Sequence, residues 1–175
     1  MTLTWSVEHR VRRIVVTLPH EYDAARELYE TLVPATDLAR FYHLGSWQAT
    51  LELAEINAPN GFMVYQRLDL TALMAGSESH WRATQYLMGN HAIAERMFRS
   101  DPAVMLHAPL RVLVYVDPAG VTNLAIDQPS TLFGSYANPD VSAVGDHLDR
   151  LLSRLIVLLG AAIPPELNGD AAASG

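Results

Sequence analysis

The arrangement of hydrophobic and polar positions along this chain predicts most of its secondary structure. Four segments are hydrophobic, rich in β-branched residues or bounded by turn formers, as strands are: residues 9–18, 62–70, 110–116 and 121–127. Three segments repeat hydrophobic residues at helical spacing: residues 21–33, 46–57 and 139–163. Segment 81–88 fits either type locally. The pattern therefore predicts a chain that mixes strands and helices.

Two asparagines mark further helix starts. Asn90 precedes segment 91–99, and its side chain can accept a hydrogen bond from a backbone N–H of a first helical turn. Asn138 is followed by Pro139, which is common at the first position of a helix. The hydrophobic residues of segment 139–163 share one broad face. We therefore expect a short helix over 91–99 and a long helix that covers the core.

Segment 110–116 has hydrophobic residues on both faces of its predicted strand. Alternation places Leu110 and Val112 on one face, and Leu113 and Tyr115 on the other beside Arg111. A second hydrophobic face needs a partner, and pairs of identical chains are the commonest oligomers. We therefore expect a homodimer whose contact involves the hairpin 109–127.

Residues 86–136 have a distinctive order: a Gly-Asn turn, a short helix, a Pro-led hydrophobic hairpin and a second ordered loop. This block resembles the DUF302 family of small bacterial α+β domains. The resemblance implies that 81–88 is a strand, which completes the order β-α-α-β-β-α-β-β-α. It implies no reaction, because the family label records that no general activity is known.

That order predicts an α+β fold: a single compact domain with an antiparallel or mixed sheet and helices packed mainly on one face. The 175 residues, 50% of them hydrophobic, suffice for one core. We expect a DUF302-like domain over residues 1–165. Residues 166–175, which follow the helix stop Pro164-Pro165 and end in NGDAAASG, are expected to form a disordered C-terminal tail.

Charge and cysteine content exclude several classes of protein. The net charge of −7, with only 12 Lys and Arg, argues against binding to a nucleic acid backbone. The absence of cysteine excludes disulfides, thiolate metal sites and cysteine nucleophiles. The longest apolar run, 155–163, is far shorter than the ~20 residues of a membrane span. No histidine pair has metal-site spacing. We expect a cytoplasmic protein with no membrane contact, metal or cofactor.

Two of the seven histidines lie in the block that resembles the family. Gly89-Asn90-His91 stands where the family commonly reads Gly-Asn-Pro, and His107 precedes Ala108-Pro109 where an aromatic or apolar residue is common. Both are departures that can specialise this chain. A histidine at a helix N-terminus has a lowered pKa and is available as a base or ligand near neutral pH. Each also has a structural interpretation, His91 as an exposed first-turn residue and His107 as a hydrogen-bonding core residue.

The predicted ligand site lies between the helix that starts at Asn90 and the loop 105–109, with His107 as its main hydrogen-bonding residue. Proline at 109 brings an extended loop toward that helix N-terminus. Candidate ligand-binding residues are Asn90, His91, Met105, Arg111 and Phe133, and candidate catalytic residues are His107 and Asp127. Core packing also accounts for Met105 and Phe133, and turn formation for Asp127.

The leading interpretation is a homodimeric small-molecule-binding domain of the DUF302 type. Its ligand is expected to be an apolar molecule that bears a carboxylate or a carbonyl group. An alternative is a cofactor-independent isomerase, cyclase or lyase, with His107 as general base and Asp127 as orienting carboxylate. A third is haem binding through an axial histidine, and a fourth is a purely structural partner domain.

Overall fold

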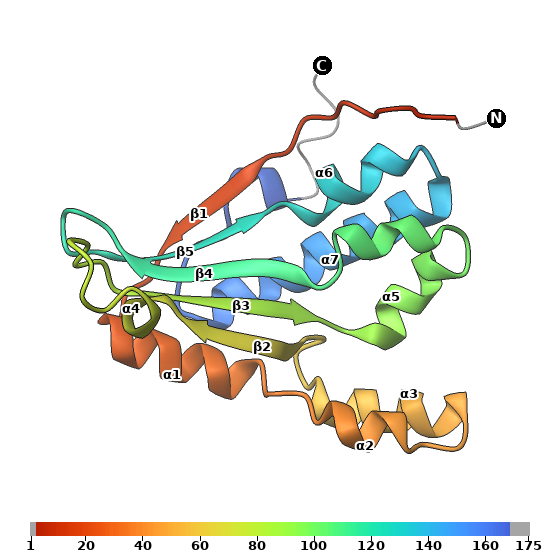
Figure 1. Ribbon diagram of the computed structural model, residues 1–175, viewed down its shortest axis with the longest axis horizontal. Coiled ribbons are helices and arrows are strands. Elements are labelled where there is room, and N and C mark those ends of the chain that lie inside the picture. Colours follow the sequence, from red (N-terminus) through yellow and green to blue (C-terminus); the bar gives the residue numbers. More distant parts are fainter. Residues whose placement is uncertain (1–2, 169–175) are drawn as a thin grey trace.

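The computed structural model describes residues 3–168 and has one five-stranded sheet with helices against it (Figure 1). The strands are β1 (Arg13–Thr17), β2 (Met63–Asp69), β3 (Ala83–Gly89), β4 (Leu110–Val116) and β5 (Thr122–Asp127). Their order in the sheet is β1-β5-β4-β3-β2, and every neighbouring pair is antiparallel. The sheet is therefore antiparallel, one of the two expected types.

The helices of the described residues include the four that the sequence predicts. All are as follows: α1 (Tyr22–Leu32), α2 (Leu38–Tyr42), α3 (Trp47–Asn57), α4 (Leu70–Leu73), α5 (His91–Phe98), α6 (Pro129–Phe133), α7 (Pro139–Leu158), and the 3₁₀ turns η1 (Pro102–Leu106), η2 (Gly134–Tyr136) and η3 (Pro165–Leu167). The long elements follow the expected order, which confirms the α+β fold. The extra helices α2, α4 and α6 are four or five residues long, too short to show a hydrophobic period.

The first strand is shorter than expected, because it begins at Arg13 and not at residue 9. A strand needs a partner, and β5 ends at Asp127, opposite Arg13. Beyond this pair, one further backbone hydrogen bond of 2.7 Å runs from the N–H of Gln128 to the carbonyl oxygen of Arg12. Its guanidinium donates to the Gln128 side chain at 3.0 Å. Residues before Arg13 therefore run beyond the sheet.

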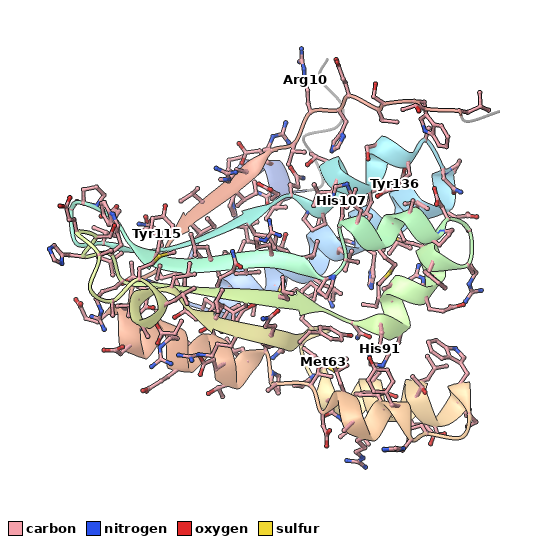
Figure 2. All side chains as sticks on the ribbon, viewed as in Figure 1. Arg10, Met63, His91, His107, Tyr115 and Tyr136 are labelled. Carbon is pink, nitrogen blue, oxygen red and sulfur yellow. The ribbon has the colours of Figure 1, made fainter. Side chains whose placement is uncertain are left out.

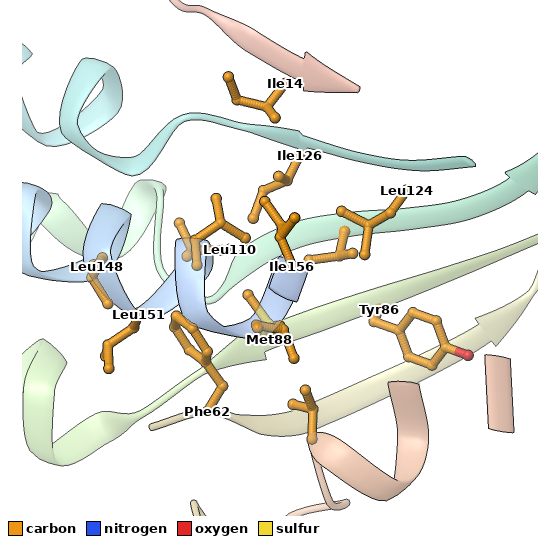
Figure 3. Close-up of a cluster of buried hydrophobic side chains, with 14 of the residues drawn as sticks. Ile14, Phe62, Tyr86, Met88, Leu110, Leu124, Ile126, Leu148, Leu151 and Ile156 are labelled. Atoms are coloured by element: carbon orange, nitrogen blue, oxygen red, sulfur yellow. The ribbon is translucent and has the colours of Figure 1, made fainter. Parts of the chain in front are cut away.

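One face of the sheet packs against the long helices. Ile14, Leu110 and Ile126 belong to one buried cluster with Ile156 of α7 (Figure 3), and Tyr86 of β3 joins the same cluster beside α1. Each of these side chains is nearly inaccessible to water. Burying a large hydrophobic side chain stabilises a fold by about 1.5–3 kcal/mol. This cluster, which also includes residues of α1, confirms that helices cover one face.

The other face of the sheet is only partly apolar. Arg111 is exposed on it, whereas Leu113 and Tyr115 are half-buried and Val15 is 51% exposed. The segment 70–81 lies over one end of this face and lines a depression with Leu113 and Tyr115. We call this surface the outer face.

The folded part of the chain extends past residue 165, the boundary that the sequence suggested. Leu167 is buried, and its carbonyl accepts a hydrogen bond from Ser153 Oγ at 3.2 Å. The Gln128 amide donates to the carbonyl of Glu166. The rest of the expected tail, residues 169–175, lies outside the described part. Within residues 3–168, no helix has the length and hydrophobicity that crossing a bilayer requires.

Candidate functional site

A cavity of about 420 Å³ lies at the end of the sheet where β3 leads into α5. It is lined mainly by hydrophobic side chains from α2, β3, α5 and α7 and from the loop before β4. They include Phe41, Met88, Ile93, Met97, Pro109 and Leu148. A pocket of this size and character is typical of small-molecule sites.

Asn90 positions the start of α5 at this cavity. Its side-chain oxygen accepts a hydrogen bond of 3.0 Å from the N–H of Ala92, so Asn90 is the N-cap that the sequence predicts. Its side-chain amide donates to the carbonyl of Gly61 at 3.1 Å. Both ends of the Asn90 side chain are therefore used within the protein. The residue holds the helix in place.

His91, labelled in Figure 2, is the first residue of α5. Tyr65 orients its ring. The Tyr65 hydroxyl lies 2.7 Å from His91 Nδ1 and also accepts a hydrogen bond from the backbone N–H of His91 at 2.9 Å. On its other side, the His91 ring meets Phe41 edge-on, with ring centroids 4.2 Å apart. The imidazole is therefore held by neighbours from α2 and β2.

The hydrogen bonds favour one tautomer of His91. The Tyr65 oxygen already accepts from the backbone, and its single hydroxyl proton is satisfied by donation to Nδ1. Neutral His91 then carries its proton on Nε2. Burial lowers the pKa of His91, which favours this neutral form. It also raises the pKa of Tyr65 to about 12, so Tyr65 keeps its proton.

His91 Nε2 is buried and has no hydrogen-bond partner among residues 3–168. The other polar side chains at the cavity differ. Thr50 donates to the carbonyl of Ser46, Asn90 and Tyr65 are paired as described, and Tyr42 is 80% exposed to solvent. His91 therefore contributes the one buried side-chain N or O atom of the lining that lacks a partner. Such an atom is costly unless something pairs with it.

His107 lies near this cavity without lining it. Its ring is edge-on to those of His9, Phe133 and Tyr136, at centroid distances of 5.8, 6.4 and 5.8 Å. Figure 2 shows His107 beside Tyr136. Burial and the nearby His9 lower the pKa of His107. Of its neighbours in the sequence, Met105 and Ala108 do line the cavity, and so does Phe133.

Arg111 and Asp127 lie on the outer face and not at the cavity. Together they line a separate depression. Asp127 Oδ1 lies 3.4 Å from Nε of Arg13 on the neighbouring strand, and both side chains are well exposed. No hydrogen bond joins Asp127 to His107 in the described chain. The structure therefore groups Asn90, His91, Met105 and Phe133 and separates them from Arg111 and Asp127.

Sequence reasoning missed Tyr65 and Phe41. Tyr65 lies in β2, where the pairing with β3 shifts between Val64 and Gln66. Such a bulge redirects a side chain, and simple alternation does not reveal it. Phe41 lies on α2, which is too short for a hydrophobic period. Within residues 3–168, no three His, Asp or Glu side chains are grouped to hold a metal ion.

The antiparallel sheet, the helices on one face and the apolar cavity define a small α+β domain. The family model described as "Domain of unknown function DUF302" matches residues 46–159, well over half of the chain. The chain belongs to the DUF302 family.

A solved structure of the same family has a similar fold. It is the crystal structure of an uncharacterized conserved DUF302 protein from Bacillus stearothermophilus, with a TM-score of 0.63 and 15% sequence identity. The similarity covers 84% of this chain and 97% of that chain. At this identity it supports the fold alone. No curated protein matches the chain.

Proposed function

We propose that this protein binds a small, mostly apolar molecule in the cavity beside His91. The observation that carries the proposal is the buried Nε2 of His91, which has no partner at a hydrophobic cavity of about 420 Å³. A hydrogen-bond acceptor on a ligand satisfies this N–H, while the ligand body contacts the hydrophobic lining. Binding of this kind removes the penalty of an unpaired buried group. The acceptor is a carbonyl or carboxylate oxygen.

The hydrogen bonds favour binding over acid–base catalysis. A general base needs a free lone pair, but Nε2 carries the proton when Tyr65 donates to Nδ1. The pair first considered from the sequence, His107 and Asp127, has no hydrogen bond that would orient the imidazole. The cofactor-independent enzyme is therefore the second candidate. Its best-placed group is His91 acting as a proton donor to a carbonyl oxygen.

Haem ligation has less support, because the favoured tautomer of His91 has Nδ1 as the acceptor of the hydrogen bond from Tyr65. A histidine that ligates iron through Nε2 usually donates its Nδ1–H to an acceptor. Here the acceptor would be the Tyr65 oxygen, which already receives the backbone N–H of His91. The Tyr65 proton would then have no partner. This donor set suits a hydrogen-bonded ligand better than a metal.

Filling the cavity tests the proposal. Ala94 lines the cavity from α5, so we expect Ala94→Phe to occupy part of it and to weaken binding of the apolar dye Nile red by at least about tenfold. Ala39→Phe is the matched control, because Ala39 is exposed on α2 and does not line the cavity. Its dye affinity should equal that of the wild type. Equal affinity of all three proteins would overturn the proposal.

We propose further that two copies pair through the outer face. Leu113 and Tyr115 supply hydrophobic surface there, and Arg111 has no carboxylate within salt-bridge distance among the described residues. In a two-fold interface each patch meets the same patch, so Arg111 of one copy can approach Asp127 of the other. Light scattering at micromolar concentration should give twice the 19.3 kDa chain mass, and Tyr115→Lys should give single chains. A wild-type mass of 19.3 kDa would exclude the dimer.

A further inference from the structure

The polar groups at the cavity say more about the ligand than that it carries an acceptor. No Lys, Arg, Asp or Glu lines the cavity, and the titratable side chains that do are His91, Tyr42 and Tyr65. The Tyr65 proton is engaged with His91 Nδ1. Among the lining residues, His91 Nε2 is thus the buried side-chain nitrogen or oxygen without a partner, and no residue of the lining carries a fixed positive charge.

Resting on the proposed function, the geometry points to a neutral carbonyl compound as the ligand: a ketone, an aldehyde or an ester with an apolar body, and not a carboxylate. A neutral carbonyl oxygen pairs with the Nε2–H of His91 and leaves no charge in the hydrophobic lining. A carboxylate would be buried without a cation, and an unpaired buried charge is far more costly than a buried carbonyl.

A carboxylate could obtain a counterion only if His91 became protonated. Protonation places a second proton on Nδ1, which then faces the Tyr65 hydroxyl at 2.7 Å. Two donors would confront each other, and the hydroxyl would have to turn away while its oxygen still accepts the backbone N–H of His91. No other acceptor for that hydroxyl exists among the hydrogen bonds of residues 3–168. The contact with Tyr65 therefore opposes the charged form of His91, independently of its burial.

A matched pair of probes tests this inference. Methyl heptyl ketone and octanoate carry the same alkyl chain, and the methyl group of one replaces a charged oxygen of the other. Calorimetry near neutral pH should show that the ketone binds at least about tenfold more tightly than octanoate. His91→Phe should weaken the ketone by removing its hydrogen-bond donor, whereas His107→Phe, a change outside the cavity lining, should leave the ketone affinity unchanged.

The outcomes separate the inference from the function on which it rests. Octanoate that binds as tightly as the ketone or more tightly would overturn the neutral-ligand inference while leaving the cavity as a binding site. Binding of neither probe to the wild-type protein would contradict both claims. A ketone affinity that His91→Phe leaves unchanged would contradict the assignment to His91.

Discussion

Two polar centres on the helix-covered side of the sheet differ in how completely their hydrogen bonds are satisfied. Glu30 on α1 accepts from the Tyr86 hydroxyl at 2.7 Å and from Arg67 Nε at 2.9 Å. At the cavity, Tyr65 satisfies one nitrogen of His91, and the other nitrogen has no partner. The three side chains of the first centre pair with one another, whereas His91 has one donor left over at the cavity. The Tyr29 hydroxyl beside the first centre is also buried without a partner, but Tyr29 does not line this cavity.

On our proposal, this difference separates a structural centre from a binding centre. Natural proteins pair nearly all of their buried polar groups, so an unpaired donor at a cavity requires a specific reason. The surrounding hydrophobic packing differs as well. The main cluster joins all five strands to α1 and α7, while a small separate cluster of Ala54, Ala58 and Met63, with Phe41 packed on it, supports the cavity wall formed by α2 and α3.

The largest expected effect lies in the main cluster. Leu152 on α7 is fully buried, so Leu152→Ala should lower the free energy of unfolding by ~2–5 kcal/mol. Leu158 near the end of the same helix is 47% exposed, and Leu158→Ala should cost less than about 1 kcal/mol. Urea denaturation measures both. Equal effects would mean that α7 faces the sheet differently.

The complete polar centre should be the next most sensitive. Glu30→Ala leaves the buried Tyr86 hydroxyl without its acceptor, which should cost about 1–3 kcal/mol. Burial, followed by the hydrogen bond to Glu30, raises the pKa of Tyr86, consistent with a phenol that keeps its proton. Adding Tyr86→Phe to Glu30→Ala should recover part of the loss in a double-mutant cycle. An additive result would show that the two groups are not coupled.

The centre around His91, which lacks one hydrogen-bond partner, should respond differently to substitution. His91→Phe removes an unpaired donor but also removes the acceptor of the Tyr65 hydroxyl, so the free energy of unfolding should change by less than about 1 kcal/mol. Ketone binding should be lost at the same time. Thermal unfolding and calorimetry on the same samples check both. A destabilisation as large as that of Glu30→Ala would make His91 a structural residue.

The smallest expected effect is a change in the pH dependence of stability. The pKa of His91 is lowered by burial in the folded protein, so the unfolded chain binds a proton more readily. The contribution of neutral His91 to the free energy of unfolding is then fully present above the unfolded pKa of about 6.5. It declines as the pH falls from there toward the folded pKa. His107 and His147 also have lowered pKa values and add to this decline.

Relative to the wild type, His91→Phe should lose less stability between neutral pH and about pH 5. Urea midpoints measured across that range test the sign. A steeper loss in the variant would mean that the pKa of His91 is raised on folding.

The sequence predicted the long elements because their patterns are local. The hydrophobic face of α7, the Asn90 cap and the β4–β5 hairpin each depend on neighbouring residues. The pairing of Tyr65 with His91 instead depends on a bulge in β2 and on the position of β2 beside β3. Such features arise from tertiary structure, so the sequence could indicate the region of the cavity without its key contact.

Alternation along the strands is enough to place Arg111 and Asp127 on the face of the sheet opposite its buried residues. Arg111 shares a face with Leu113 and Tyr115, opposite the buried Leu110 and Val112. Asp127 follows the buried Ile126 and therefore points to the outer face as well. Proximity in sequence to His107 favoured grouping these residues, but side-chain parity along a strand places them on the opposite surface.

The most direct test of the central claim is ¹⁵N NMR of the His91 ring with and without methyl heptyl ketone, using His91→Phe to assign the signals. Our account predicts a neutral ring protonated on Nε2 at neutral pH, and an Nε2–H signal that shifts downfield when the ketone accepts its hydrogen bond. A proton on Nδ1, or an Nε2 signal that saturating ketone leaves unchanged, would contradict the account.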